Sequence, residues 1–399
     1  MPSPSGSPGL PSLTGLRFLL AANVLTAHAF SGSALFSEKL QAALSIAAVP
    51  LATSAVSGFF VLSGFVLAWS HRPGDRPRSF WRRRFWKIYP NHALGWLMGA
   101  LFFGVTTAPS PMAAGGGATV TGGVAELFLV KVWVPAQEVF NGFNDPSWSV
   151  CCEAFFYLLF PVLMSAARRL TGVGLRSAWL ALAGVILVLP AVALELGGRA
   201  VPGWPLGLNT LWFGYVFPPV RLAEFLLGIV TARLVQVQSW PRLNAPTRIG
   251  ALATVFAATP FVPRPYCLGA GYGVPLSLTI AALALRDIDG RSRLLARPAV
   301  VALGEASYAL YILHFPLVMS ARQAVGVNHR FAALNGVLFA VGLMAAAQAL
   351  ALLVHRRYER PLQARFARDT RAVPCARAEP GTTPFAGPGA GPGHPARTQ

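Results

Sequence analysis

The segment AWLALAGVILVLPAVALELG, residues 178–197, contains one charged side chain, Glu195, close to its end. An α-helix of this length spans about 30 Å, which is the thickness of the hydrocarbon core of a bilayer. A surface helix of a soluble protein needs a polar face, and this segment has none. The segment therefore predicts a membrane-spanning helix.

Nine other apolar segments resemble it. The whole chain is 54% hydrophobic and only 12% charged, whereas a typical soluble domain has roughly 25% charged residues. We therefore expect an all-α fold, a polytopic integral membrane protein of about ten transmembrane helices. The other nine segments lie near 12–31, 50–70, 90–107, 148–166, 216–234, 249–263, 270–285, 299–320 and 332–354.

The basic residues predict the orientation. Lys and Arg number 33 against 14 Asp and Glu, and most of them lie in short clusters at 71–89, 167–177, 235–248, 286–298 and beyond 355. These connections share one side of the membrane, and an excess of Lys and Arg marks the cytoplasmic side. We expect a multi-pass protein of the cell membrane with both termini cytoplasmic and lipids around it. Clusters between long apolar segments also argue against a nucleic-acid partner.

The chain divides into three predicted parts. Residues 1–11 form a disordered N-terminus without the basic region of a signal peptide, and 12–358 form the transmembrane domain. Residues 359–399 form a basic, Pro-, Gly- and Ala-rich cytoplasmic tail, predicted to be disordered. The long outer connection, 108–147, contains VAELFLVKVWVP (124–135), which we interpret as a re-entrant or interfacial helix.

Ionisable residues inside membrane spans are costly, so each is a functional candidate. His28 lies 11 residues after Arg17 in the first segment, about 16 Å further along a helix. Imidazole accepts a proton near neutral pH, although a His bonded to a neighbouring carbonyl is an equal alternative. Glu153 begins the fourth segment and needs a partner: it either orients His28, binds a substrate hydroxyl, or pairs with Arg221.

Other polar side chains fall at a similar depth. Arg221 and Glu224 lie three residues apart on the sixth segment, which also suits a local salt bridge. Tyr308 and His314 lie on the ninth segment, where packed aromatic rings with satisfied polar tips are the alternative. Because these residues come from different helices, we predict that they converge on a substrate-binding site.

Two further groups carry weaker signals. The run Arg82, Arg83 and Arg84 lies in RPRSFWRRRFWKIYP (76–90), predicted as a cytoplasmic loop that binds either phosphates or lipid headgroups.

The four cysteines match no metal-binding or redox spacing, so we expect no metal. They are Cys151, Cys152, Cys267 and Cys375.

Seven motifs in order resemble the membrane-bound acyltransferase type 3 family, which modifies glycans, lipids and natural products. The resemblance runs from Leu13 to Pro361. The motifs are LTGLR (13–17) with Arg17-x10-His28, SGFFVLSGFVL (57–67), RFWKIYP (84–90), PSWSVCCEAFFYLLFP (146–161), RLAEFLLG (221–228), LGEASYALYILHFP (303–316) and HRRYERP (355–361).

The resemblance implies transfer of an acyl group, often acetyl, from acyl-CoA to a hydroxyl of a glycan, lipid-linked sugar or secondary metabolite. His28 and Glu153 then match catalytic positions. Arg17 and the Arg82–Arg84 run match positions that serve the acyl donor, and no cofactor is permanently bound. Glu153 is a single acid where many members have two. The competing hypothesis is a transporter or exporter of a small amphipathic molecule, because polar residues at membrane depth suit that function too.

Overall fold

The computed structural model describes residues 9–33, 35–72, 74–106, 117–201, 206–326 and 328–367. These residues are almost entirely helical, and no named β-strand occurs among them. The helices are α1 (Pro11–Ala27), η1 (His28–Gly32), α2 (Glu38–Ser70), α3 (Pro77–Thr106), α4 (Val120–Leu127), α5 (Gln137–Phe140), η2 (Asp145–Ser147), α6 (Trp148–Arg169), α7 (Gly172–Glu195), α8 (Leu208–Leu211), η3 (Trp212–Val216), α9 (Pro218–Gln236), α10 (Ala245–Ala258), η4 (Thr259–Phe261), η5 (Tyr266–Ala270), α11 (Gly271–Ile288), α12 (Pro298–Glu305), α13 (Ser307–Val325), α14 (Ala333–Val354), η6 (His355–Glu359) and α15 (Arg360–Phe366).

Every predicted apolar segment contains a helix, which confirms the all-α polytopic fold, but ten full spans are not confirmed. Seven helices in the described residues are long and apolar enough to cross a membrane. An eighth results if α12 and α13, bent by 58° at their junction, count as one span. The other two helices, α3 and α10, do not pass this test. The first half of α3 is basic, and α10 has 14 residues, about 21 Å.

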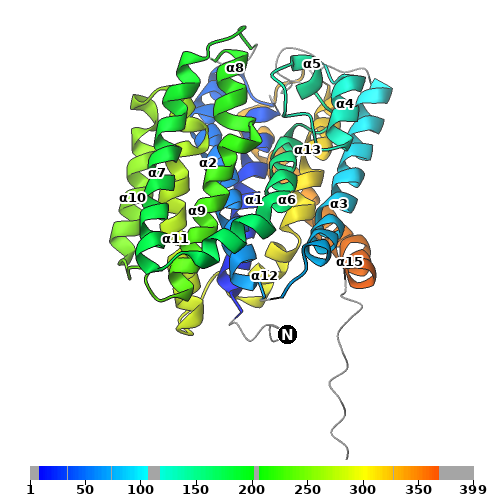
Figure 1. Ribbon diagram of the computed structural model, residues 1–399. Coiled ribbons are helices and arrows are strands. Elements are labelled where there is room, and N and C mark those ends of the chain that lie inside the picture. Colours follow the sequence, from blue (N-terminus) through cyan, green and yellow to red (C-terminus); the bar gives the residue numbers. More distant parts are fainter. Residues whose placement is uncertain are drawn as a thin grey trace, which may run out of the picture. The chain divides into compact units, whose positions relative to one another are not determined.

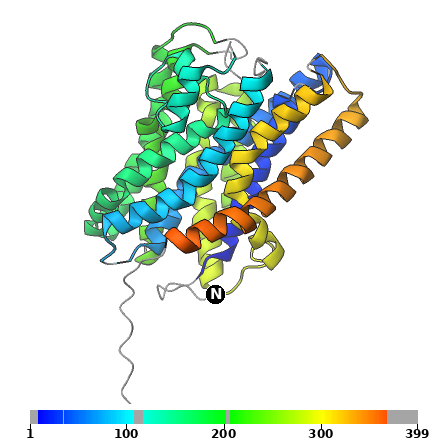
Figure 2. The ribbon, with the colours of Figure 1, turned by 90° about the vertical axis from the view of Figure 1, so that its right-hand side faces the viewer.

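The bundle has two chemically different ends (Figures 1 and 2). Helices α4, α5 and α8 lie at one end, which we call the loop end; α12 and α15 lie at the opposite end, which we call the basic end. The basic end includes the last turn of α6, with Arg168 and Arg169, and the first part of α3. Successive long helices run between the two ends in alternate directions, so the order predicted from the sequence is preserved.

Helix α2 packs closely along α9 because each helix has a glycine that lies against the backbone of the other helix. Gly64 of α2 lies against the carbonyl of Phe225, and Gly228 of α9 lies against the carbonyl of Val61. A Cβ atom at either glycine would overlap the opposite backbone. Small residues allow such close approach of helices in membranes, where dispersion contacts replace the hydrophobic effect. The motif SGFFVLSGFVL therefore has a packing function.

Prolines inside the helices free carbonyl groups that other helices then use. Pro161 has no N–H to donate to the carbonyl of Tyr157, and the indole Nε1 of Trp81 donates to that carbonyl at 3.0 Å. Pro316 likewise frees the carbonyl of Ile312, which accepts a hydrogen bond from Asn144 Nδ2 at 2.9 Å. Backbone groups at membrane depth need such partners, so these bonds tie α3 to α6 and the outer connection to α13.

The basic segment 76–90 is a helix and not the loop predicted for it. Helix α3 starts at Pro77, about three turns before the predicted start of the third span. Proline is favoured in the first turn of a helix, and Arg and Lys are good helix formers, which explains the early start. At the chain's other end, helical structure continues across the predicted domain boundary at 358 to Phe366. The predicted disordered segments lie largely outside the described residues, from 1 to 8 and beyond 367.

Candidate functional site

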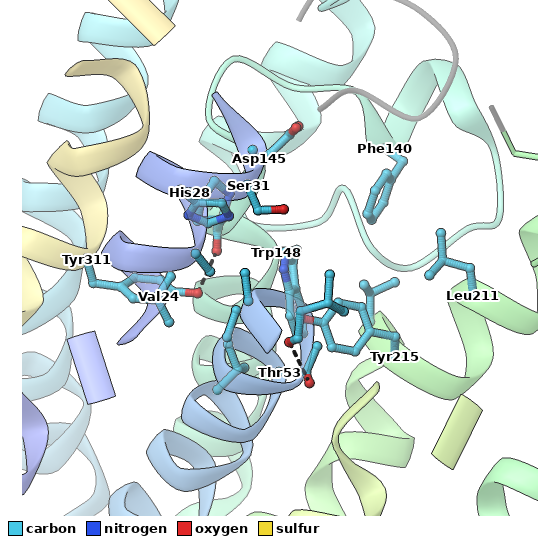
Figure 3. A pocket seen from close by; sticks show the side chains of 18 residues that line it. Val24, His28, Ser31, Thr53, Phe140, Asp145, Trp148, Leu211, Tyr215 and Tyr311 are labelled. Atoms are coloured by element: carbon cyan, nitrogen blue, oxygen red, sulfur yellow. Dashed lines mark hydrogen bonds between the residues drawn. The ribbon is translucent and has the colours of Figure 1, made fainter. Parts of the chain in front are cut away.

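A cavity of about 170 Å³ lies toward the loop end, between α1, α2, η3, α13 and the outer connection. We call it the outer cavity (Figure 3). Of its 18 lining residues, most are aliphatic or aromatic. Those with polar side-chain atoms are His28, Ser31, Thr53, Asp145, Trp148, Tyr215 and Tyr311.

His28 is held by His314 across the helix interface. Nδ1 of His28 lies 2.7 Å from Nε2 of His314, and the two rings stack with centroids 5.0 Å apart. His314 is 1% exposed, and its Nδ1 lies 3.1 Å from the carbonyl oxygen of Leu310. His28 also marks the change from α-helix α1 to the π-helical turn η1. Such π turns are frequent at functional sites, and this one places the ring at the cavity wall.

These two hydrogen bonds fix which nitrogens carry protons in the neutral pair. A carbonyl oxygen only accepts, so Nδ1 of His314 must donate to Leu310. The Nε2 atom of neutral His314 is then an acceptor, and Nδ1 of His28 must donate to it. This leaves Nε2 of His28 with a free lone pair. Among the described residues, no side chain donates a hydrogen bond to that nitrogen. It can therefore take a proton from a molecule in the outer cavity.

Glu153 does not contact His28. It lines a second cavity of about 40 Å³, which we call the deep cavity, together with Val56, Phe59, Phe60, Ser149, Val150, Ser307, Tyr308 and Tyr311. The carboxylate interacts electrostatically with Arg17, Arg84 and Lys87 and with the Tyr157 hydroxyl. The residue that orients His28 is therefore His314, and Glu153 lies in a separate group of charges.

Tyr308, predicted beside His314, also faces the deep cavity. Its hydroxyl donates to the carbonyl of Ile88 in α3 at 2.9 Å. Tyr311, which the sequence analysis did not select, lines both cavities. Its hydroxyl lies 2.7 Å from Ser149 Oγ and donates to the carbonyl of Pro146 at 3.2 Å. Tyr311 lies three residues before His314 on the same helix, so the two side chains share one face. That spacing could have predicted a role for Tyr311.

The three consecutive arginines have different surroundings. Arg84 lies over the rings of Phe80 and Tyr157 and interacts with Glu153 and Arg17 inside the bundle. Arg83 pairs with Asp75 at 2.9 Å near the surface, and Arg82 is half-buried. Arg84 of this run therefore reaches the group of charges that contains Arg17 and Glu153.

The predicted substrate-binding residues Arg221 and Glu224 form a buried ion pair at 2.8 Å. The Arg221 guanidinium also donates to Ser57 Oγ at 3.0 Å and lies over the ring of Tyr215. Neither Arg221 nor Glu224 lines either cavity. The local salt bridge weighed from the sequence is thus present, and it supports the wall formed by Tyr215.

A buried ion pair missed by the sequence analysis holds the outer connection in place. Lys131 and Glu126 are 1% and 0% exposed and lie 3.6 Å apart. Lys131 donates to the carbonyl of Asn144 at 2.9 Å, and the backbone N–H of Asn144 donates to Glu126 at 3.0 Å. The predicted interfacial helix is only partly present, since α4 ends at Leu127. The pair could have been predicted from the sequence, because Glu126 and Lys131 are the two charged residues of the apolar segment 124–135.

A second missed group lies at the basic end. The Glu359 carboxylate accepts hydrogen bonds from Lys87 at 2.8 Å, Asn91 at 3.0 Å and Gln363 at 2.8 Å, and it lies 3.0 Å from His355 Nδ1. The motif HRRYERP therefore ties the end of α14 to α3. In the described part of the chain, no group of three or more His, Cys, Asp or Glu could hold a metal ion.

Comparison with known proteins defines the class. A family model described as an acyltransferase domain, the acyltransferase 3 family, matches residues 10–356. The chain is 37% identical over 363 residues to acyltransferase MdmB of Streptomyces mycarofaciens, covering 88% of this chain and 91% of that protein. Nodulation protein 10 of Rhizobium leguminosarum bv. viciae is 29% identical over 132 residues, 29% of this chain and 34% of that protein. No solved structure gives a significant match.

The chain therefore belongs to the acyltransferase 3 family, as its motifs predicted. It is a multi-pass membrane enzyme that transfers an acyl group from a donor to a hydroxyl-bearing acceptor. Membership in this family favours the enzyme over the competing transporter hypothesis.

Proposed function

We propose that this enzyme transfers a short acyl group, such as acetyl, from acyl-CoA to a hydroxyl of an acceptor in the outer cavity, with His28 as general base. The observation that carries the proposal is the His28–His314 pair, 2.7 Å between ring nitrogens, at the wall of that cavity. It provides a neutral imidazole whose outer nitrogen is available as a base. General bases contribute about 10²- to 10⁴-fold to a rate.

In the proposed reaction, Nε2 of His28 removes the acceptor hydroxyl proton as the oxygen attacks the thioester carbonyl carbon. The new carbon–oxygen bond forms and the carbonyl becomes a tetrahedral oxyanion. When the oxyanion collapses, the carbon–sulfur bond breaks, and the thiolate takes the proton from Nε2 of His28. The products are the acyl ester and free CoA, and His28 returns to its neutral form. His314 keeps Nδ1 of His28 as the donor throughout, so Nε2 remains the reactive nitrogen.

The donor enters from the basic end in this proposal, and that end faces the cytoplasm. The support is the distribution of charge: Arg17 and Arg84 approach Glu153 inside the bundle, and the clusters of Arg residues lie at the same end. Guanidinium groups suit the phosphates of CoA because they donate paired hydrogen bonds. The positive-inside bias of membrane proteins supports a cytoplasmic position for the same end.

The lining of the outer cavity favours one class of acceptor. A glycan presents hydroxyls on all sides and needs many polar partners, because unpaired polar groups are costly to bury. The outer cavity offers few such partners and many apolar ones, among them Val24, Phe140, Trp148 and Leu211. We therefore favour a secondary metabolite with a largely apolar body over a glycan or a lipid-linked sugar.

The test is acyl transfer in purified membranes. Membranes with the wild-type chain should transfer label from acetyl-CoA to an apolar metabolite that carries a hydroxyl, and His28→Ala should abolish transfer while the protein still inserts and folds. His329→Ala is a matched control, because His329 lies between α13 and α14 and lines neither cavity. Full transfer by His28→Ala would contradict the proposed role of His28.

A further inference from the structure

The two cavities lie in series along the bundle. Helix α2 runs from the loop end to the basic end; its residues from Ala48 to Thr53 line the outer cavity, Val56 lines both, and Phe59 and Phe60 line the deep cavity. On α13, which runs the other way, Ser307 and Tyr308 line the deep cavity before Tyr311 lines both. The deep cavity is thus one to two helical turns closer to the basic end.

The deep cavity contains two polar groups that can bind a ligand. The Glu153 carboxylate accepts a hydrogen bond from the Tyr157 hydroxyl, and its remaining lone pairs have Arg17, Arg84 and Lys87 only as electrostatic neighbours. Ser307 is 4% exposed, and its hydroxyl has no hydrogen-bond partner among the same residues. Buried polar groups normally have partners, so the cavity is suited to a ligand that supplies both a donor and an acceptor.

Four of the other seven lining residues are apolar: Val56, Phe59, Phe60 and Val150. The hydroxyls of the remaining three, Ser149, Tyr308 and Tyr311, are already hydrogen-bonded within the protein. A suitable ligand therefore combines methyl and methylene groups with amide N–H and C=O groups. The pantetheine arm of CoA has this composition. Its gem-dimethyl group suits the phenylalanine rings, an amide N–H suits Glu153, and an amide carbonyl suits the Ser307 hydroxyl.

Length also agrees with this ligand. Arg17 and His28 are 11 residues apart on α1 and η1, about 16 Å at the rise of an α-helix. The pantetheine arm has about 13 bonds from phosphorus to sulfur. An extended chain advances about 1.1–1.2 Å for each bond, giving about 15 Å. With the phosphates at Arg17, the sulfur therefore reaches the level of His28.

We propose that the deep cavity is the binding site for the pantetheine arm of the acyl donor, with Glu153 and Ser307 as its polar contacts and Tyr311 at the border with the acceptor. This inference rests on the proposed use of acyl-CoA. It assigns Glu153 to donor binding and separates it from the proton-transfer pair of His28 and His314.

The test measures binding of CoA without an acyl group to the full chain in nanodiscs, alongside adenosine 3′,5′-bisphosphate, which lacks the pantetheine arm. Ser307→Leu fills the deep cavity and should weaken CoA binding about tenfold or more, with little change for the bisphosphate. Glu153→Leu should behave alike, and Glu153→Gln should retain more affinity because its amide oxygen still accepts a hydrogen bond. Unchanged bisphosphate binding also establishes that each variant is folded.

The matched control is Ala52→Leu, which fills the outer cavity only. It should leave CoA binding unchanged and raise the KM for the acceptor. Equal CoA affinity in wild type, Ser307→Leu and Glu153→Leu overturns the inference while leaving the proposed function intact. A wild-type chain that binds neither CoA nor acyl-CoA overturns the proposed function itself. If Ser307→Leu weakens only the binding of longer acyl-CoAs, the cavity holds the acyl chain, and the assignment to pantetheine is wrong.

Discussion

The Nδ1 atom of His28 and the Nε2 atom of His314 lie 2.7 Å apart, although 286 residues separate them in the chain. The second hydrogen bond of His314, to the carbonyl of Leu310, determines the direction of the first. A histidine on one helix thereby sets the tautomer of a histidine on another. The relationship has consequences that differ from those of a simple packing contact.

Replacing His314 should slow the chemical step without weakening donor binding. His314→Leu removes the acceptor of the His28 Nδ1 proton, so both tautomers of His28 become accessible and kcat should fall about 100-fold. His314→Gln restores an acceptor oxygen and should retain more activity than the leucine variant. Steady-state kinetics and the ¹⁵N chemical shifts of His28 would check this. Equal kcat values for the Leu and Gln variants would exclude control of the tautomer.

Arg84 and Arg83 should contribute differently to donor binding. Arg84→Met removes a guanidinium that interacts with Glu153, and the KM for acyl-CoA should rise about tenfold. Arg83→Met is the matched control, because Arg83 is paired with Asp75 near the surface. Kinetics at varied acyl-CoA concentration decide the matter. If both variants behave alike, the run acts only as a general positive surface.

Breaking the buried pair under the outer connection should destabilise the protein. Lys131→Met leaves the Glu126 carboxylate buried without its partner, and loss of one partner of a buried pair costs about 3–5 kcal/mol. The double variant Lys131→Met with Glu126→Gln should recover part of that loss. Thermal unfolding in detergent measures both. A double variant as unstable as the single one would mean that the hydrogen bonds to Asn144 matter more than the charge.

The glycines between α2 and α9 should not tolerate a side chain. Gly64→Ala places a Cβ against the Phe225 carbonyl and should cost about 1–3 kcal/mol of stability through overpacking. Gly184→Ala in α7 and Gly342→Ala in α14 meet no atom within 4 Å, so they should be neutral or slightly stabilising. Unfolding measurements on the three variants check the difference. Similar effects at all three positions would argue against close packing of α2 on α9.

The bond from Trp81 to α6 should matter only while Pro161 is present. Trp81→Phe leaves the Tyr157 carbonyl without a donor and should cost about 1–3 kcal/mol. In a Pro161→Ala background, the alanine N–H supplies that donor within the helix, so the same Trp81 substitution should cost less. A double-mutant cycle of unfolding free energies measures the coupling. A coupling energy of zero would mean that the alanine N–H in Pro161→Ala does not replace the Trp81 indole as the donor to the Tyr157 carbonyl.

Much of the fold could be predicted from the sequence, because each span is specified locally by its apolar composition. Residues 178–197 need only their own side chains to be recognised as a span. The class of enzyme could likewise be predicted from ordered motifs. The number of full spans could not, because α3 combines a basic half with an apolar half and α10 is short. The early start of α3 was missed because charge suggested a loop where Arg and Lys favour a helix.

The candidate site was predicted as a set of residues at one depth, and the structure divides that set. Counting residues along each helix predicted one depth for His28, Glu153 and His314. Glu153 instead lines the deep cavity, closer to the basic end than His28. Which of them meet depends on how the helices are rotated and how closely they pack. Those features arise from contacts such as Gly64 against Phe225, between residues far apart in the chain.

The sequence by itself therefore determined the membrane fold and the family, since these follow from local composition and from ordered motifs. Only the tertiary structure decided that His314 partners His28, that Glu153 faces a separate cavity, and that Arg221 is committed to Glu224. A hydrogen bond requires atoms within about 3 Å of each other. That proximity is a property of the packed bundle and not of any single segment.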